Sequence, residues 1–301
     1  MESLSFRAQL LAAQGRNASM LCVGLDPEPA KFPAAWRGDA SRIFDFCAAI
    51  VEATKDSVCA FKPQIAYFAA QRAEDQLEKL IAYIHKTAPG LPVILDAKRG
   101  DIGATAEQYA REAFERYRAD ALTLSPFMGF DSIEPYTRYP GKGLILLCRT
   151  SNPGGSDLQT QRLEGGELLY ERIARLAGSS WNRNGDVDLG LVVGATYPAE
   201  VARVRELAPT LPLLIPGIGA QGGDALATVR AGWRPGAPII VSSSRAVLYA
   251  GTGGTNDTSG DSGNSGTSGT SGTSGAGFAQ AARTAAQSTR DLLQRSRPAA
   301  S

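Results

Sequence analysis

The chain has 301 residues, 43% of them hydrophobic and 20% charged, which is enough for one large α/β domain with a sizeable core. Its 31 Lys and Arg side chains against 30 Asp and Glu leave a net charge of +1, so electrostatics gives no reason to expect binding to nucleic acid or to an anionic membrane surface. The one histidine, His85, excludes a zinc site built on two or three histidines, and no GxSxG motif accompanies it as a serine hydrolase would require.

The N-terminal segment and the cysteines are typical of an intracellular protein. The first residues include an early acid, Glu2, and no long apolar run, so we expect no secretory signal. The longest apolar runs, such as Leu144–Cys148, are far shorter than a membrane span. None of the four cysteines forms a CxxC pair, and three lie in or beside apolar runs, as buried thiols do in a reducing compartment. The sequence therefore predicts a cytoplasmic protein.

Apolar runs alternate with amphipathic segments along the chain. Eight runs predict strands, at Met20–Asp26, Ala60–Gln64, Pro92–Lys98, Ala121–Ser125, Gly143–Thr150, Leu189–Thr196, Leu211–Gly217 and Pro238–Ser243. Helical spacing is found between them, at Ile43–Thr54, Ala73–Thr87, Thr105–Arg118, Glu167–Leu176, Ala199–Leu207 and Ala225–Ala231. Strands that are apolar throughout indicate a parallel sheet buried on both faces. The pattern predicts a (β/α)₈ TIM barrel as a single domain over residues 1–301, with a doubly wound sheet as the structural alternative.

Polar side chains collect where these strands end. Asp26 closes the first strand, Lys62 and Gln64 the second, and Asp96 and Lys98 the third. The later strands end in Arg149, Thr150 and Ser151, in Gly217-Ile218-Gly219, and in Ser244 and Arg245. Polar strand ends are common, but barrel enzymes build their active sites at this edge. The repetition over six of eight strands predicts a site there.

The third strand carries the sharpest motif, Asp96-Ala97-Lys98-Arg99-Gly100-Asp101. Residues two apart on a strand face the same side, so Asp96 and Lys98 can both point into the barrel mouth, with Asp101 just beyond. A lysine between two carboxylates is held in its charged form. It therefore suits an ammonium acid better than a Schiff-base nucleophile, which must be neutral. A surface ion pair with no chemical role is the alternative.

A glycine-rich turn follows the seventh strand, where residues 217–222 match GxGxxG. NAD is excluded because the dinucleotide motif needs an acidic residue about 20 positions further on, and none lies between Asp224 and Asp257. Backbone N–H groups in such a turn can still hold an anion, and barrels often bind phosphate after strands seven and eight. The sequence predicts a phosphate site with Gln221, Ser244 and Arg245, since the planar guanidinium donates two hydrogen bonds. The alternative for Arg245 is a surface loop cap.

The segment Gly251–Gly277 differs in composition from the rest of the chain. It holds 10 glycines in 27 residues, and Ala276 is its only apolar side chain. A segment this poor in apolar surface cannot offset the entropy of ordering, so we expect a flexible loop. One helical pattern follows it, from Phe278 to Leu293, which is too little for a second domain. The segment is therefore predicted to interrupt one domain near its end.

Five pieces of the sequence together resemble the orotidine 5′-phosphate decarboxylase family, in its longer bacterial subgroup. They are LDAKRGDIGAT, PGIGAQGG, GLDPEP, FKPQIAYF and the Ser-Arg pair after the eighth strand. The resemblance covers essentially the whole chain outside Gly251–Gly277, which departs from the pattern of the family. It implies a cofactor-free decarboxylation of orotidine 5′-phosphate to UMP and CO₂, with no metal.

The resemblance also implies roles for residues around the reacting carbon. Lys98 would protonate C6 of the pyrimidine, and Lys62, Asp96 and Asp101 would complete an alternating charge network. Asp101 and Thr105 would reach across a homodimer interface into the neighbouring site. A fixed ammonium is the kind of group that stabilises charge developing at C6 and then delivers a proton.

The remaining roles that the resemblance implies concern substrate binding. Asp26 and Lys62 would hold the ribose hydroxyls. Gln221 and Arg245 would bind the phosphate. Ser151 would hydrogen-bond the pyrimidine, although its neighbours Thr150 and Asn152 are equally placed to do so.

Two other functions remain open from the residues alone. Other phosphosugar barrels carry acids and lysines on strand ends, so an aldolase or epimerase acting on a sugar phosphate is the first alternative. It requires a neutral lysine or a bound metal, and the flanking carboxylates disfavour the former. A non-catalytic nucleotide-binding barrel is the second alternative. It would need the phosphate site but no ammonium group at a reacting carbon.

Overall fold

The computed structural model describes residues 4–182, 188–218, 224–251 and 277–298. Eight parallel strands form one sheet in the order β2-β1-β8-β7-β6-β5-β4-β3. They are β1 (Leu21–Leu25), β2 (Ala60–Pro63), β3 (Ile94–Arg99), β4 (Ala121–Leu124), β5 (Gly143–Arg149), β6 (Asp188–Val193), β7 (Leu213–Pro216) and β8 (Ile239–Ser243). Parallel bridges Phe61–Val93 and Gln64–Asp96 join β2 to β3 and close the barrel. The predicted fold class and all eight strands are confirmed, and the doubly wound alternative is wrong.

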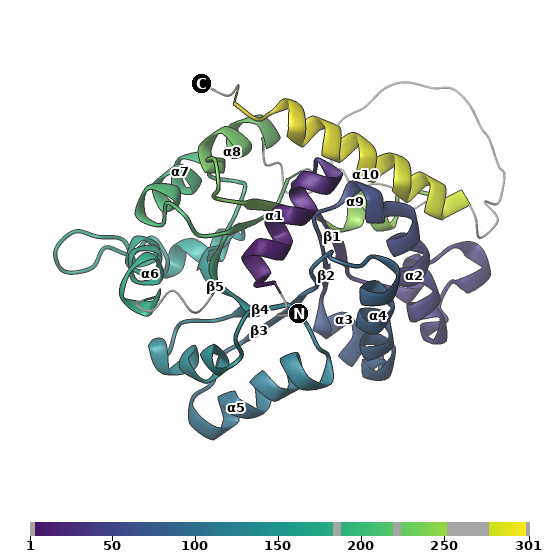
Figure 1. The fold of residues 1–301 in the computed structure, drawn as a ribbon, viewed down its shortest axis with the longest axis horizontal. Helices are drawn as coiled ribbons and strands as arrows, with labels where there is room; N and C mark the ends of the chain where they lie inside the picture. The colour runs from purple at the N-terminus through teal and green to yellow at the C-terminus, as the bar shows by residue number, and fades with distance from the viewer. Residues whose placement is uncertain (1–3, 183–187, 219–223, 252–276, 299–301) are drawn as a thin grey trace.

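Helices pack around the barrel, except for the first, which lies across one end of it (Figure 1). They are α1 (Phe6–Asn17), α2 (Ile43–Thr54), α3 (Ile65–Ala69), α4 (Glu74–Thr87), α5 (Gly103–Arg111), α6 (Leu169–Gly178), α7 (Pro198–Leu207), α8 (Ala225–Gly232), α9 (Arg245–Leu248) and α10 (Gly277–Arg295). The helix predicted over Thr105–Arg118 is divided, because α5 ends at Arg111 and a π-helical turn spans Glu112–Arg116. The final helix packs on α2 through the stacked rings of Phe278 and Phe46, 5.3 Å apart.

Two apolar layers form the core because side chains alternate across each strand. Leu21, Val23 and Leu25 of β1 point outward and pack with the surrounding helices. Cys22, between them, points inward and belongs to a smaller cluster inside the barrel. All four cysteines are free and buried, as predicted. Burial raises the pKa of the Cys22 thiol to about 12, so this residue behaves as a small apolar side chain.

The first helix, α1, was not predicted and closes the amino-terminal end of the barrel. Figure 1 shows it lying across the centre of the ring of strands. Phe6 enters the inner core, and a Cβ on Gly143 at the start of β5 would lie 2.4 Å from its ring. Gln14 donates a hydrogen bond to the carbonyl of Ile239 at the start of β8. Because α1 closes the amino-terminal end of the barrel, a ligand can enter only at the carboxyl-terminal ends of the strands.

The predicted insertion, Gly251–Gly277, lies outside the described residues except for its two terminal glycines. Its place as one loop within a single domain therefore stays a prediction. Among the helices that the structure describes, none is long and apolar enough to cross a membrane.

Candidate active site

A cavity of about 400 Å³ opens at the carboxyl-terminal ends of the strands. Its wall brings together most of the residues singled out in the sequence, namely Asp26, Lys62, Asp96, Lys98, Thr150, Ser151, Asn152, Ser244 and Arg245. They come from β1, β2, β3, β5 and β8 and the loops that follow these strands. The structure therefore places these strand-end residues around a single cavity. Gln221, the other predicted phosphate ligand, lies outside the described residues.

Asp96 is the centre of the polar cluster in this cavity. Its Oδ2 accepts a hydrogen bond from Lys62 Nζ at 2.7 Å, and its Oδ1 accepts one from Lys98 Nζ, also at 2.7 Å. Thr123 Oγ1 donates to the same Oδ1 at 2.9 Å. The Lys62 and Asp96 side chains are 8% and 9% exposed, whereas Lys98 is 46% exposed. The cluster thus joins a buried ion pair to a lysine that can reach a ligand.

Thr123 on β4 also shapes the backbone that carries Lys98. Its Oγ1 accepts hydrogen bonds from the backbone N–H groups of Ala97 and Lys98, each at 3.0 Å. The pairing of β3 with β4 shifts register between Leu95 and Arg99, and Lys98 has a φ of +48°. A left-handed conformation is strained for a lysine and is kept only where surrounding contacts enforce it. Sequence reasoning missed Thr123, although it is the one polar side chain in the apolar β4.

Electrostatics keeps the buried pair charged. Burial would raise the pKa of the Asp96 carboxyl, but the charges and hydrogen bonds of Lys62 and Lys98 outweigh it and lower the pKa below its usual range. Burial likewise opposes the charged form of Lys62, yet attraction to Asp96 and Asp26 raises its pKa above the ordinary value. An anion and an ammonium are therefore both present at the floor of the cavity near neutral pH.

The β1 end of the cavity holds an unused acceptor. Asp26 Oδ1 is buried and has no hydrogen-bond partner among the described residues. The backbone there is fixed, because Tyr249 Oη donates to the Asp26 carbonyl at 2.9 Å and accepts from Glu28 N–H at 2.8 Å. A buried carboxylate oxygen without a donor is costly, so this position suits a ligand hydroxyl.

The β8 end of the cavity carries Ser244 and Arg245, the first of them close to β1. A Cβ on Gly24 would lie 2.0 Å from Ser244 Oγ, so glycine at this position leaves room for the serine side chain. Arg245 is exposed at the cavity wall and has no carboxylate partner in the described part of the chain. Gly217 on the adjoining loop has a φ of +104°, which glycine adopts without strain. This side of the cavity carries a cation and hydroxyl groups, which are suited to binding an anionic ligand.

Asp101 and Thr105 do not line the cavity of their own chain. The Oδ1 atom of Asp101 accepts a hydrogen bond from Ile102 N–H, and Thr105 is exposed on α5. Ile102, which follows Asp101 directly, exposes a large apolar side chain, as do Phe127 and Met128 in the segment after β4. The structure therefore separates these two predicted site residues from the remainder.

The β5 end contributes all three residues between which the sequence could not choose. Thr150, Ser151 and Asn152 line the cavity. Ser151 packs closely against Gly194 at the end of β6, where an added glycine Cβ would lie 2.7 Å from the Cβ of Ser151. No group of three or more His, Cys, Asp and Glu side chains that could hold a metal occurs within the described ranges.

The sequence and the fold of this chain are similar to those of known decarboxylases. The family model for the orotidine 5′-phosphate decarboxylase / HUMPS family matches residues 19–252. The chain is 75% identical over 256 residues to an orotidine 5′-phosphate decarboxylase of Methylibium petroleiphilum, which covers 82% of this chain and 91% of the relative. A Variovorax paradoxus protein of the same name is 65% identical over 98% of this chain and its own full length. The structure of Leishmania donovani OMP decarboxylase aligns with a TM-score of 0.78 and 36% identity over 97% of this chain and 99% of that one.

Proposed function

We propose that Lys98 is the acid that protonates C6 of the pyrimidine in the reaction of this enzyme. The chain belongs to the orotidine 5′-phosphate decarboxylase family. It converts orotidine 5′-phosphate to UMP and CO₂, a step of pyrimidine biosynthesis. One observation carries this assignment. Lys98 Nζ is held by the buried Asp96 at 2.7 Å, at the wall of the cavity, while its side chain stays half exposed.

The reaction leaves an electron pair at C6 in the plane of the ring, where the ring cannot delocalise it. The charged Lys98 stabilises that pair directly and then donates its proton. Asp96 orients the ammonium, and Lys62 balances the charge of Asp96 so that the carboxylate persists in a buried place. The chemistry assigned here needs no cofactor.

The rest of the cavity binds the parts of the substrate that do not react. Arg245 and Ser244, with Gln221, hold the phosphate, and Asp26 with Lys62 holds the ribose hydroxyls. Among the residues that the structure describes, the buried Oδ1 of Asp26 has no hydrogen-bond partner, which supports the second assignment because a hydroxyl supplies a donor. Ser151 contacts the pyrimidine at the β5 end. Binding energy from the remote phosphate can then be used to stabilise the transition state.

The alternative of a sugar-phosphate aldolase or epimerase is not favoured. Relatives that are 65–75% identical carry the decarboxylase name. The ion pair between Lys98 and Asp96 also opposes the neutral lysine that Schiff-base chemistry requires. A cytoplasmic location fits a nucleotide-forming enzyme and is part of the proposal.

The test mixes the protein with orotidine 5′-phosphate and follows the loss of orotate absorbance. Wild type should turn over, and Lys98→Ala should fold and still bind UMP but lose at least about a hundredfold in rate, the lower range for a general acid. Lys86→Ala, an exposed lysine on α4, is the matched control and should act like wild type. A Lys98→Ala enzyme retaining more than a hundredth of the rate would remove Lys98 from this role. A wild type that binds UMP without turnover would instead indicate a nucleotide-binding barrel.

We further propose a homodimer in which Asp101 and Thr105 enter the site of the partner. Their position outside their own cavity and the exposed apolar side chain of Ile102, which follows Asp101 directly, support this arrangement. Lys98→Ala and Asp101→Ala subunits can be mixed after dissociation. If Asp101 acts across the interface, each hybrid has one intact site, and about a quarter of wild-type activity returns. No recovery in a mixture that exchanges subunits would place Asp101 in its own site.

A further inference from the structure

The backbone of the active site is strained at one residue, Lys98. Among the residues that the structure describes, four that are not glycine have a positive φ, and three of these, Ala18, Arg72 and Arg118, come shortly after a helical segment. A left-handed residue is common there because it ends the helix. Lys98 differs, since its φ of +48° lies within β3. A lysine keeps this conformation only where its surroundings enforce it, and such strain is concentrated at functional sites.

The pairing of β3 with β4 shows where the backbone is displaced. Between two paired positions, residues 96–98 of β3 lie opposite a single residue of β4, Thr123. Extra residues of this kind form a bulge, in which N–H groups lose their partners on the neighbouring strand. Pairing resumes directly afterwards, where the Ser125 N–H donates to the Arg99 carbonyl at 2.7 Å. Bulges beside active sites change the direction of a side chain, and Lys98 is the last residue of this one.

Thr123 supplies the hydrogen bonds that the bulge lacks. Its Oγ1 accepts from the backbone N–H groups of Ala97 and Lys98, each at 3.0 Å. An N–H group can only donate, so these two bonds occupy both lone pairs of the hydroxyl oxygen. The one hydroxyl hydrogen is then left for Asp96 Oδ1, which lies 2.9 Å away. The Thr123 side chain belongs to a residue only 1% exposed, so solvent hardly reaches these bonds.

The same hydroxyl is connected to the ammonium group of Lys98. Asp96 Oδ1 accepts from Lys98 Nζ at 2.7 Å as well as from Thr123. Thr123 thus holds the backbone nitrogen of Lys98 directly and its Nζ through one carboxylate oxygen. Lys62 binds the other oxygen of that carboxylate, so the carboxylate cannot turn to follow a displaced lysine without losing this bond. Both ends of the lysine are therefore fixed relative to β4.

Threonine is well suited to this position. Its β-branched side chain has a restricted χ1, so Oγ1 keeps one direction. Valine has nearly the same shape, but it would leave two buried N–H groups without an acceptor and would remove one donor from Asp96. Serine would keep all three hydrogen bonds on a less restricted side chain. The hydroxyl can therefore be removed or kept with little change in the volume of the side chain.

We propose that Thr123 is a positioning residue for the decarboxylation, because its hydroxyl holds Lys98 in the left-handed conformation that directs the ammonium group to the reacting carbon. This step rests on the proposed function, in which Lys98 is the acid. Thr123 acts through Lys98 and Asp96 and needs no contact with the substrate. A displacement of about 1 Å can cost about a hundredfold in rate, so loss of the hydroxyl lowers kcat. Substrate binding at the β1 and β8 ends is left in place.

The test compares kcat and KM among variants of Thr123. Thr123→Val should lower kcat about ten- to a hundredfold, while KM and the binding of UMP change less than about twofold. Thr123→Ser should recover most of kcat. Thr123→Cys, whose thiol is a weak donor and a weak acceptor, should lie between the two. A Thr123→Val enzyme with the kcat of wild type, or one in which only KM changes, would overturn the proposal.

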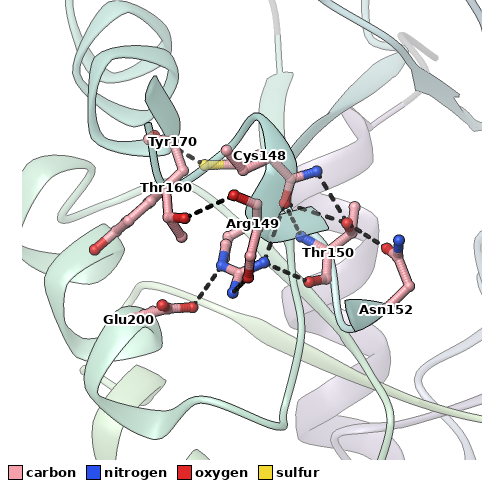
Figure 2. A network of polar contacts seen from close by, with 9 residues as sticks. Cys148, Arg149, Thr150, Asn152, Thr160, Tyr170 and Glu200 are labelled. Carbon is pink, nitrogen blue, oxygen red and sulfur yellow. Dashed lines mark hydrogen bonds and ion pairs between the residues drawn. The ribbon is translucent and has the colours of Figure 1, made fainter. Parts of the chain in front are cut away.

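The matched control replaces a threonine that makes no contact with Lys98 or Asp96. Thr160 belongs to the network at the end of β5, where its Oγ1 donates to the Ser156 carbonyl at 2.9 Å (Figure 2). It does not line the cavity. Thr160→Val removes the same hydroxyl group and should keep the kcat of wild type. A loss of kcat in Thr160→Val equal to that in Thr123→Val would mean that the effect is not specific to the Lys98 backbone.

Two further measurements separate the possible causes of a loss. Thermal melting of each variant shows whether kcat falls because less protein is folded. If Thr123→Val does not fold, Thr123→Cys decides, because a kcat equal to that of Thr123→Ser would contradict the proposal. Lys98→Ala, measured in parallel, tests the proposed function. Full activity of Lys98→Ala would refute that function, whereas an inactive Lys98→Ala beside a fully active Thr123→Val would refute only the role of Thr123.

Discussion

Two buried arginines at opposite ends of the barrel have different partners. Arg149, at the carboxyl-terminal end, pairs with Glu200 and with side chains of the loop behind the cavity. Arg205 is 1% exposed near the amino-terminal end. Within the described part of the chain it donates only to backbone carbonyls, those of Gly232, Ala208, Pro209, Leu211 and Pro238. Burial and the repulsion of Arg234 and Arg7 lower the pKa of Arg205 to about 10. A buried arginine thus orders the loop behind the cavity at one end of the barrel. At the other end, a buried arginine supplies hydrogen bonds to the backbone carbonyls of the turns before β7 and β8.

Replacing Arg205 should have the largest effect on stability. Arg205→Met leaves several buried carbonyls without a donor, so we expect a loss of about 3 kcal/mol or more in the free energy of unfolding. The kcat of the molecules that remain folded should be unchanged. Arg149→Met is the matched comparison, with a smaller loss of stability and a raised KM. Urea unfolding and kinetics at low temperature measure both variants. Equal kinetic effects in the two would contradict the division between the ends.

A third arginine, Arg245, is exposed at the cavity and should matter for binding alone. Arg245→Ala removes a charge-assisted contact to phosphate, worth about 1.5–3 kcal/mol, so kcat/KM should fall roughly ten- to a hundredfold. The melting temperature should stay close to that of wild type, in contrast to Arg205→Met. An unchanged kcat/KM, or a loss confined to thermal stability, would exclude Arg245 as the phosphate ligand.

The buried pair at the carboxyl-terminal end should also give stability a pH dependence. Because the folded pKa of Asp96 lies below its unfolded value of about 3.9, its contribution is complete above that value and is lost as pH falls. The folded pKa of Lys62 is raised, so its contribution is complete below about pH 10.4 and is lost at higher pH. The difference in unfolding free energy between wild type and Asp96→Asn should be constant from about pH 5 to 9 and shrink in acid. A difference that grows in acid would contradict this sign.

The smallest effect is expected from the Gly/Ser/Thr segment. Deleting residues 252–276 and joining the ends with a short Gly-Ser link should leave activity and melting temperature nearly intact, because the removed residues include one apolar side chain. Activity and thermal melts of the two chains measure this. A large loss of either would show that the segment has a function in the enzyme.

Much of this protein follows from local patterns in the chain. The eight strands were predicted because runs of apolar residues bounded by polar ends are a property of consecutive residues. Asp96 and Lys98 were found for the same reason, since two residues apart on one strand share a face. Arg245 was predicted as a phosphate ligand because barrels often bind phosphate after the last strands, and the structure places it at the cavity wall.

Other features depend on contacts between distant parts of the chain. The helix α1 packs into the base of the barrel against Gly143, more than a hundred residues away in the chain. No local pattern in the sequence of α1 predicts this contact. Thr123 reaches Asp96 only because β4 lies beside β3. The left-handed backbone of Lys98 is likewise imposed by its neighbours rather than by its residue type.

The choice among Thr150, Ser151 and Asn152 is the clearest case. The sequence alone cannot distinguish three adjacent polar residues in one loop, because it does not show which of them donates a hydrogen bond and which accepts one. Direction comes from Gln159 and Arg149, whose donors and acceptors are brought against Thr150 by the folded loop. Residue types along the chain are enough to place a polar site at the mouth of a barrel. Which atom of that site faces the ligand depends on the tertiary contacts that orient each donor.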